Sequence, residues 1–245
     1  MFQLQMIDIM IIFILVGGAI IGLKRGFLKT SVSFIGVLLV LILAYILKNP
    51  LSEFMYMHFP FLNFGGEFAN ITIINILIYE AIAFAFLVLI FGFLMKLIIV
   101  FTGLLERIAK LTNILGFLSQ IIGFVFGFIK TYIIIFAIFF VLHYFVNINP
   151  FIEQGVITSK MVHDTPILSK ASEKERKTFD EIIDLRERCN NANGDELVKC
   201  NQESLDIMLK YEVLKPATAR KLVDSKKLKI QNADEIIKKY EKKDA

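Results

Sequence analysis

The sequence predicts an all-α membrane protein with four transmembrane helices and a charged helical tail. Of the 245 residues, 56% are hydrophobic, with 24 Phe and no Trp, whereas soluble domains have roughly 45–50% apolar residues. Residues 1–149 contain 8 Lys or Arg and 5 Asp or Glu, but residues 150–245 contain 19 and 18. We therefore expect a lipid-embedded domain at 1–149 and an aqueous tail at 150–245. Neither part is basic enough to indicate nucleic-acid binding.

The first three spans are expected at residues 7–23, 30–47 and 73–95. A helix needs about 20 apolar residues to cross the hydrocarbon core of a bilayer. The first span contains only Asp8 at its edge, the second contains no charge, and the third is interrupted only by Glu80. These three segments therefore have the composition of membrane helices.

The fourth hydrophobic stretch, residues 114–146, contains Lys130 near its middle. Its length of about 33 residues exceeds one upright span and is too short for two spans with a turn. We interpret it as one span over 120–146 with a lead-in segment. The alternative is a hairpin around Lys130, which would place the tail in the cytoplasm.

Basic residues beside the spans predict the orientation, because Lys and Arg that flank a span are retained in the cytoplasm. The connections 24–29 and 96–112 contain three basic residues each, whereas 48–72 contains one. The topology-determining residues are Lys24, Arg25, Lys29, Lys96, Arg107 and Lys110. We expect the amino terminus and the tail to be extracytoplasmic. A cleaved signal peptide is not expected, because residues 1–6 contain no Lys or Arg.

The second of these connections has an amphipathic pattern. Apolar residues recur at steps of three and four and share one helical face: Leu97, Phe101, Leu104, Ile108 and Leu111. This pattern predicts a helix in the membrane interface. A continuation of the third span into water fits the pattern equally well.

Two sets of glycines predict close helix packing, because small residues at helical spacing let a neighbouring backbone approach. These residues are Gly17, Gly18 and Gly22 on the first span, and Gly116, Gly123 and Gly127 on the fourth. A transport path or a groove for a partner is the alternative meaning of the same pattern.

Asp8, Glu80 and Lys130 are the ionisable residues expected at membrane depth. Each costs at least about 2.5–3.5 kcal/mol there unless it faces the bundle interior or water. Glu80 and Lys130 could form a buried pair that fixes helix register. The functional alternative is a proton or ion relay, which would need more such groups in series.

The order of these motifs resembles the colicin V production (CvpA) family of bacterial inner-membrane proteins. The resemblance covers roughly residues 5–168. It is carried by Asp8, the turn Gly22, Lys24, Arg25, Gly26 and Phe27, the segment 111–116 (LTNILG), the run Gly116, Gly123, Gly127 and Lys130, and the segment 159–168 (SKMVHDTPIL) with Thr165 and Pro166.

The resemblance implies a multi-span protein of the bacterial inner (plasma) membrane, associated with production or export of the peptide toxin colicin V and with envelope maintenance. It implies no catalytic residue. Some family members carry an extracytoplasmic serine protease after the four spans. The tail of this chain is too short for such a protease and lacks its Gly-rich β-strand character.

The tail is expected to form three or four short helices, with breaks at residues 190–195 and near Pro216. Its cysteines, Cys189 and Cys200, lie on either side of the first break. In an oxidising compartment they could close a helical hairpin through a disulfide. In a reducing cytoplasm they would remain two thiols.

No enzyme signature is complete, and we expect no enzyme activity, cofactor or metal. His58, His143 and His163 lack metal-ligand spacing, and the segment 123–131 lacks the spacing of a phosphate-binding loop.

The expected partners are the lipid bilayer and a membrane or envelope protein, with a homo-oligomer left open. The main hypothesis is a non-enzymatic scaffold or export component. The alternatives are a transporter or channel subunit that uses Glu80 and Lys130, and a membrane anchor for a soluble enzyme.

Overall fold

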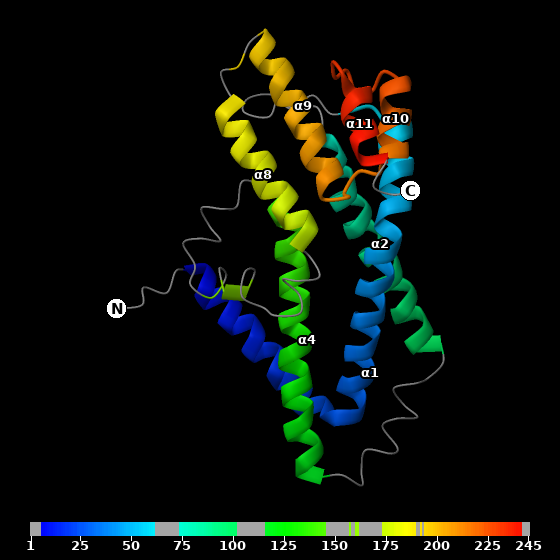
Figure 1. Cartoon of the computed structure of the whole chain (residues 1–245). Coiled ribbons are helices and arrows are strands. Elements are labelled where there is room, and N and C mark those ends of the chain that lie inside the picture. Colours follow the sequence, from blue (N-terminus) through cyan, green and yellow to red (C-terminus); the bar gives the residue numbers. More distant parts are fainter. Residues whose placement is uncertain are drawn as a thin grey trace. The chain divides into compact units, whose positions relative to one another are not determined.

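The computed structural model describes residues 6–61, 74–101, 116–145, 157, 160–161, 173–189, 192 and 194–241. Almost all of these residues are helical and none is in a strand, so the all-α prediction is confirmed for this part of the chain. The main helices are α1 (Met6–His58), α2 (Ile74–Phe101), α4 (Gly116–Phe145), α8 (Glu173–Cys189), α9 (Asp195–Lys210), α10 (Pro216–Asp224) and α11 (Ala233–Glu241) (Figure 1).

Internal packing divides the chain into two compact units. The first unit contains residues 1–49 and 81–166, and the second contains residues 50–80 and 167–245. The second unit thus combines the tail with the end of α1 and the start of α2. The boundary predicted at residue 149 is one between a lipid-embedded part and an aqueous part, and it does not coincide with the boundary between the packing units. It stays a prediction.

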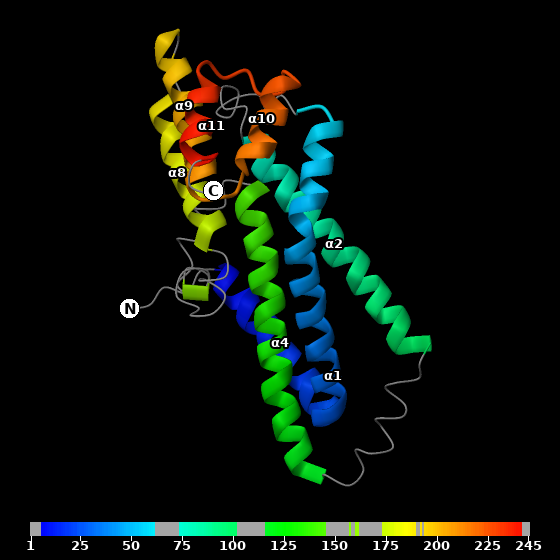
Figure 2. The ribbon, with the colours of Figure 1, turned by 45° about the vertical axis from the view of Figure 1, so that its right-hand side comes forward.

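Helix α1 is bent sharply at Gly26, whose φ of 73° and ψ of 174° are not helical. A positive φ is readily adopted by glycine but costs energy for residues with a Cβ. The legs on either side, residues 6–25 and 27–49, form a V in both ribbon views (Figures 1 and 2). The connection expected across 24–29 is therefore a kink at one residue.

Three of the described helices are long and apolar enough to cross a membrane. They are α1 over Met6–His58, α2 over Ile74–Phe101, and residues Phe117–Phe139 of α4. Because a straight helix of the length of α1 would extend about 80 Å, the kink at Gly26 is what gives this helix two legs of membrane-spanning size. Four crossings stay a prediction.

Helix α4 runs without a break through Lys130. The hairpin alternative for residues 114–146 is therefore wrong. Residues 116–145 contain no proline, and residues 132–142 after Lys130 are all apolar, which favours one continuous helix. Helix α2 continues to Phe101, while Arg107, Lys110 and the rest of the predicted interface helix lie outside the described residues.

Residues 173–241 of the tail form four helices in their described part, in agreement with the three or four expected. Helix α9 packs against α8 and α11, and α10 packs against α11. Pro216 occupies the first turn of α10, where its missing N–H costs no hydrogen bond. The most completely buried side chains of the four helices include Ile182, Leu185, Leu205, Met208, Leu222 and Ile237.

Lys227 forms one attachment between the tail and the end of α1. Lys227 Nζ donates hydrogen bonds to the carbonyl oxygens of Tyr56 at 2.8 Å and Phe59 at 2.9 Å, and also to that of Met57. The last carbonyls of a helix have no partner within the helix. A lysine ammonium also complements the negative end of the helix dipole. Lys227 therefore caps α1.

Glu53 forms a second attachment between α1 and the tail. Its Oε1 accepts hydrogen bonds from Thr218 Oγ1 at 3.2 Å and from Lys221 Nζ at 3.4 Å. Thr218 is 4% exposed, whereas the Lys221 side chain is largely exposed to water. The first turn of α10 is thus held against α1 within the second unit.

Candidate functional site

The first leg of α1 packs against α4 through glycines. A Cβ on Gly22 would lie 2.1 Å from the carbonyl oxygen of Gly123, and a Cβ on Gly127 would lie 2.5 Å from that of Gly18. Such distances leave no space for any side chain, so the two backbones are in direct contact. Gly17 has nothing within 4 Å of the same position. We call this contact the glycine seam.

The seam runs antiparallel. Gly123 contacts Gly22 and Gly26, whereas Gly127, one turn later on α4, contacts Gly18 and Gly22. Beyond Gly127 the next residue in the row is Thr131, whose hydroxyl would collide with a Cβ on Gly18. Gly116 begins α4.

Two hydroxyl groups satisfy the backbone at the Gly26 kink. Thr30 Oγ1 donates a hydrogen bond of 3.2 Å to the carbonyl oxygen of Gly22, and Phe27 N donates one of 2.9 Å to Ser119 Oγ. Thr30 is 2% exposed and Ser119 is 4% exposed. Because these two side chains are buried inside the protein, backbone groups beside them that lacked a hydrogen bond would be costly. These hydroxyls allow the kink to exist inside the bundle.

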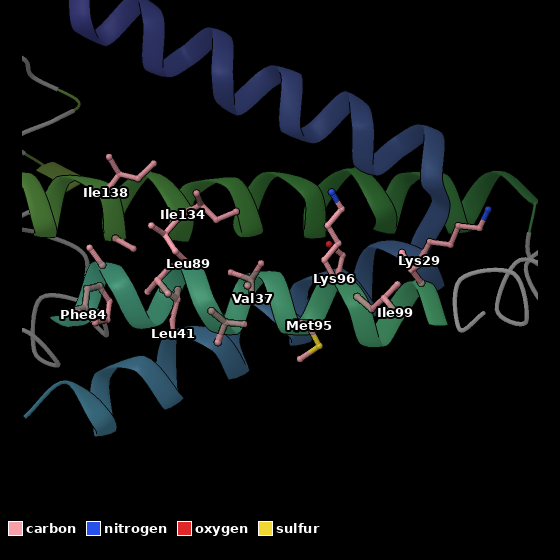
Figure 3. A pocket seen from close by; sticks show the side chains of 18 of the residues that line it. Lys29, Val37, Leu41, Phe84, Leu89, Met95, Lys96, Ile99, Ile134 and Ile138 are labelled. Carbon is pink, nitrogen blue, oxygen red and sulfur yellow. The ribbon is translucent and has the colours of Figure 1, made fainter. Parts of the chain in front are cut away.

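An apolar groove of about 1000 Å³ lies among the second leg of α1, α2 and α4 within the first unit. Its walls include Val37, Leu89 and Ile134 (Figure 3). Gly36 and Gly92 also line it, and a Cβ on Gly92 would meet nothing within 4 Å. Its volume is at the upper end of the range of about 300–1000 Å³ for ligand sites.

The charged residues of the groove wall are all basic. Arg25, Lys29 and Lys96 line the groove, and none of its described lining residues is acidic. Figure 3 shows Lys29 and Lys96 in the half of the groove away from Phe84 and Ile138. A fourth cation reaches the wall, because Lys130 Nζ donates a hydrogen bond of 3.3 Å to Ser33 Oγ, and Ser33 also lines the groove.

Three of the predicted topology residues, Arg25, Lys29 and Lys96, thus share one wall. Lys24 is exposed and does not line the groove. The sequence gives the position of each cation along its own helix. It does not show that α1 and α2 bring these cations to one groove. Ser119, Thr30 and Lys227 were not predicted, because single hydroxyls and a tail lysine give no pattern of their own.

The three ionisable residues expected at membrane depth have different environments. Asp8 is fully buried, and its Oδ1 accepts a hydrogen bond of 3.0 Å from the backbone N–H of Ile157. Lys130 bonds to Ser33, as described above. Glu80 is 5% exposed and belongs to the second unit, whereas Lys130 belongs to the first. A pair between Glu80 and Lys130 stays a prediction.

Cys189 and Cys200 form a disulfide between the end of α8 and the first turns of α9.

Among the described residues, no group of three or more His, Cys, Asp or Glu is placed to hold a metal ion. His58 Nδ1 lies 2.8 Å from the carbonyl oxygen of Phe54, and its ring stacks on that of Phe54. His163 and the side chain of His143 lie outside the described residues.

The apolar helices, the glycine seam and the groove define a multi-pass helical membrane protein. The comparison with known families is more specific, since the profile described as "Colicin V production protein" matches residues 7–167. The chain therefore belongs to the colicin V production protein family, as its motifs predicted.

A relative in Bacillus subtilis (strain 168) is also a membrane protein. The protein named "Uncharacterized transmembrane protein YshB" is 27% identical over 173 residues, which cover 67% of this chain and 93% of that protein. No solved structure gave a significant match.

Proposed function

We propose that this chain is a non-enzymatic scaffold or export component of the bacterial inner (plasma) membrane. It would act in colicin V production and in envelope maintenance. Family membership supports the process. The observation that carries the scaffold role is the attachment of α10 and Lys227 to the end of α1, because this attachment makes the tail a platform held on a membrane helix rather than a free extension.

The platform has the features of a docking domain. Its four helices share one core, and a disulfide joins two of them. Its rim is charged, with ion pairs such as Arg188–Glu203 and Arg220–Glu241. Exposed ion pairs contribute little stability, but their charged groups are available at the surface for polar contacts with a partner. A membrane or envelope protein is the partner that we propose, and a second copy of the chain is the alternative.

Four crossings, with the amino terminus and tail extracytoplasmic, complete the proposal. The second unit contains residues 50–80 as well as the tail, which supports one side of the membrane for both. The basic connections before and after these residues support a cytoplasmic location for the other ends of the helices. The disulfide supports an oxidising compartment for the tail.

Cysteine labelling in intact cells tests the orientation. In a Cys189→Ala/Cys200→Ala background, Lys229→Cys should react with a membrane-impermeant thiol reagent before lysis. Lys24→Cys, at an exposed position in the connection that we expect on the cytoplasmic side, is the matched control and should react only after permeabilisation. Labelling of the two positions in the reverse order would overturn the orientation.

Complementation tests the scaffold role. In a deletion strain that secretes a colicin V-type peptide, the wild-type chain should restore toxin release, whereas Lys227→Met should not, at equal membrane abundance. Lys229→Met changes an exposed lysine two residues away and should restore release. Equal release with Lys227→Met and with Lys229→Met would contradict a role for the docked tail.

Transport is the second candidate, favoured by the buried carboxylates of Asp8 and Glu80 and by Lys130 at the groove wall. Glu80→Gln and Lys130→Met separate the two candidates. Loss of ion or toxin flux in proteoliposomes with normal folding and abundance would favour transport. Loss of abundance would favour a packing role for these residues.

A further inference from the structure

The apolar wall of the groove does not by itself select an occupant. Lipid tails are as apolar as leucine, so no hydrophobic force drives a protein helix from the bilayer into such a groove. Acyl chains already surround an intramembrane groove and can enter it at little cost. The choice of occupant therefore depends on the basic end of the groove.

The length of the groove fits one lipid molecule. On α2 its lining extends from Phe84 to Val100, a distance of about 24 Å at 1.5 Å per residue. One leaflet, including its headgroups, is about 20–22 Å thick, since the whole bilayer is about 40–45 Å. The groove thus covers a headgroup and its acyl chains without reaching far into the opposite leaflet.

The charge at the basic end indicates the headgroup. Arg25, Lys29 and Lys96 come from two helices and line one groove, with no carboxylate among the described lining residues to neutralise them. Lys130 reaches the same wall through Ser33. Arginine and lysine side chains commonly bind phosphate oxygens in proteins, and basic pockets between membrane helices suit anionic headgroups.

We infer that the groove binds one anionic phospholipid. Its phosphate lies at Arg25, Lys29 and Lys96, and its acyl chains lie along Val37, Leu89 and Ile134. The inference does not rest on the scaffold proposal, because it concerns the first unit alone. A lipid bound here would fill the space among three helices and hold them together.

Two glycines provide a steric test. A Cβ on Gly92 or on Gly17 would meet nothing within 4 Å, so the backbone at either position accepts a side chain. Gly92 lines the groove and Gly17 does not. Gly92→Phe should fill the groove and reduce retained phosphatidylglycerol at least fivefold, whereas Gly17→Phe should retain the wild-type amount.

The charge test uses the full-length protein purified from mixed phosphatidylglycerol and phosphatidylcholine vesicles into a neutral detergent, with retained lipid counted by mass spectrometry. Wild type should retain about one phosphatidylglycerol per chain in preference to phosphatidylcholine. Lys29→Gln/Lys96→Gln should lower this preference by about fivefold per cation removed. Lys24→Gln, beside the groove but not in it, should leave the preference unchanged.

Four results would overturn the inference. Equal retention of the two lipids by wild type would remove the charge selection, and equal behaviour of Gly92→Phe and Gly17→Phe would place the lipid elsewhere. A dimer that Gly92→Phe dissociates would assign the groove to a second copy. Inorganic phosphate at millimolar concentration should not displace the lipid, and displacement would indicate an anion site instead. Thermal unfolding of each variant shows that it is folded.

Discussion

The backbone N–H of Phe27 donates a 2.9 Å hydrogen bond to the side chain of Ser119, which lies 92 residues further along the chain. Phe27 follows the only residue of α1 with non-helical backbone angles, Gly26, so its N–H has lost the partner that a continuous helix would provide. Helix α4 supplies that partner. The hydrogen bonding at the bend in α1 is therefore completed by a side chain of α4.

Removal of the Ser119 hydroxyl should destabilise the first unit. Ser119→Ala leaves the Phe27 N–H unpaired in a site where Ser119 is 4% exposed, and an unpaired buried donor costs about 1–3 kcal/mol. Thermal unfolding in detergent should show the loss, and amide exchange at Phe27 should accelerate.

Ser31→Ala is the matched control for that change. Within the described part of the chain, Ser31 Oγ is buried and has no hydrogen-bond partner. Its removal should be neutral or slightly stabilising, because a buried hydroxyl without a partner is itself unfavourable. An equal loss of stability from Ser31→Ala and Ser119→Ala would show that the Phe27 contact contributes nothing specific.

A side chain in the glycine seam should separate the two helices. Gly22→Leu places a Cβ 2.1 Å from the carbonyl oxygen of Gly123, and backbone atoms cannot move aside as a side chain can. Overpacking typically costs about 1–3 kcal/mol, which lowers the unfolding temperature and the cellular abundance. Gly17→Leu, five residues earlier on the open face, should change neither, and similar losses from both variants would contradict the seam.

Reduction of the disulfide should loosen the α8–α9 hairpin. Cys189 and Cys200 are 11 residues apart, and closing a loop of about 12 residues is worth roughly 3 kcal/mol by chain entropy. Dithiothreitol should therefore lower the urea midpoint of the tail in the full-length protein. The variant Cys189→Ala/Cys200→Ala should start at the lower midpoint and not respond to dithiothreitol; a response would mean that reduction acts elsewhere.

The tail should lose stability in acid partly through Glu181. Burial acts to raise the pKa of this carboxyl, but the hydrogen bonds from Tyr211 and Lys210 outweigh it and hold the pKa below its usual value. A group whose pKa is lowered on folding stabilises the protein above its unfolded pKa, about 4.3 for Glu. This contribution is lost as the pH falls through the folded pKa.

Glu181→Gln tests that prediction by acid titration of tail unfolding. The variant should be less stable than wild type near neutral pH and should converge with it below about pH 4. Glu187→Gln removes one negative charge from the same helix, α8, and controls for net charge. A constant difference between Glu181→Gln and wild type at every pH would exclude the titration of Glu181 as the cause.

The helical content of this chain could be predicted because uncharged runs near 20 residues leave few alternatives to a membrane helix. The glycines at intervals of four could also be recognised as a packing face. The kink at Gly26 could not, because the sequence Lys24 to Lys29 reads equally well as a loop of several residues. Only the backbone angles place the change of direction at one glycine.

Contacts between distant segments could not be predicted from the sequence either. A helical face is visible in a sequence, but the face that it meets is not, so the groove and its shared basic end required the structure. Lys227 lies among many tail lysines with similar neighbours in the sequence. Its hydrogen bonds to the end of α1 depend on where α10 ends, and one sequence alone does not give that position.

The glycine seam also constrains chain length. Because each residue of a helix advances the rotation by about 100°, one inserted or deleted residue between Gly18 and Gly22 would turn the two glycines away from each other and from Gly127. Substitutions on the outer, lipid-facing side of this leg change no such alignment. Relatives can therefore diverge widely in sequence there, while any change in the number of residues across this short interval would uncouple the two helices.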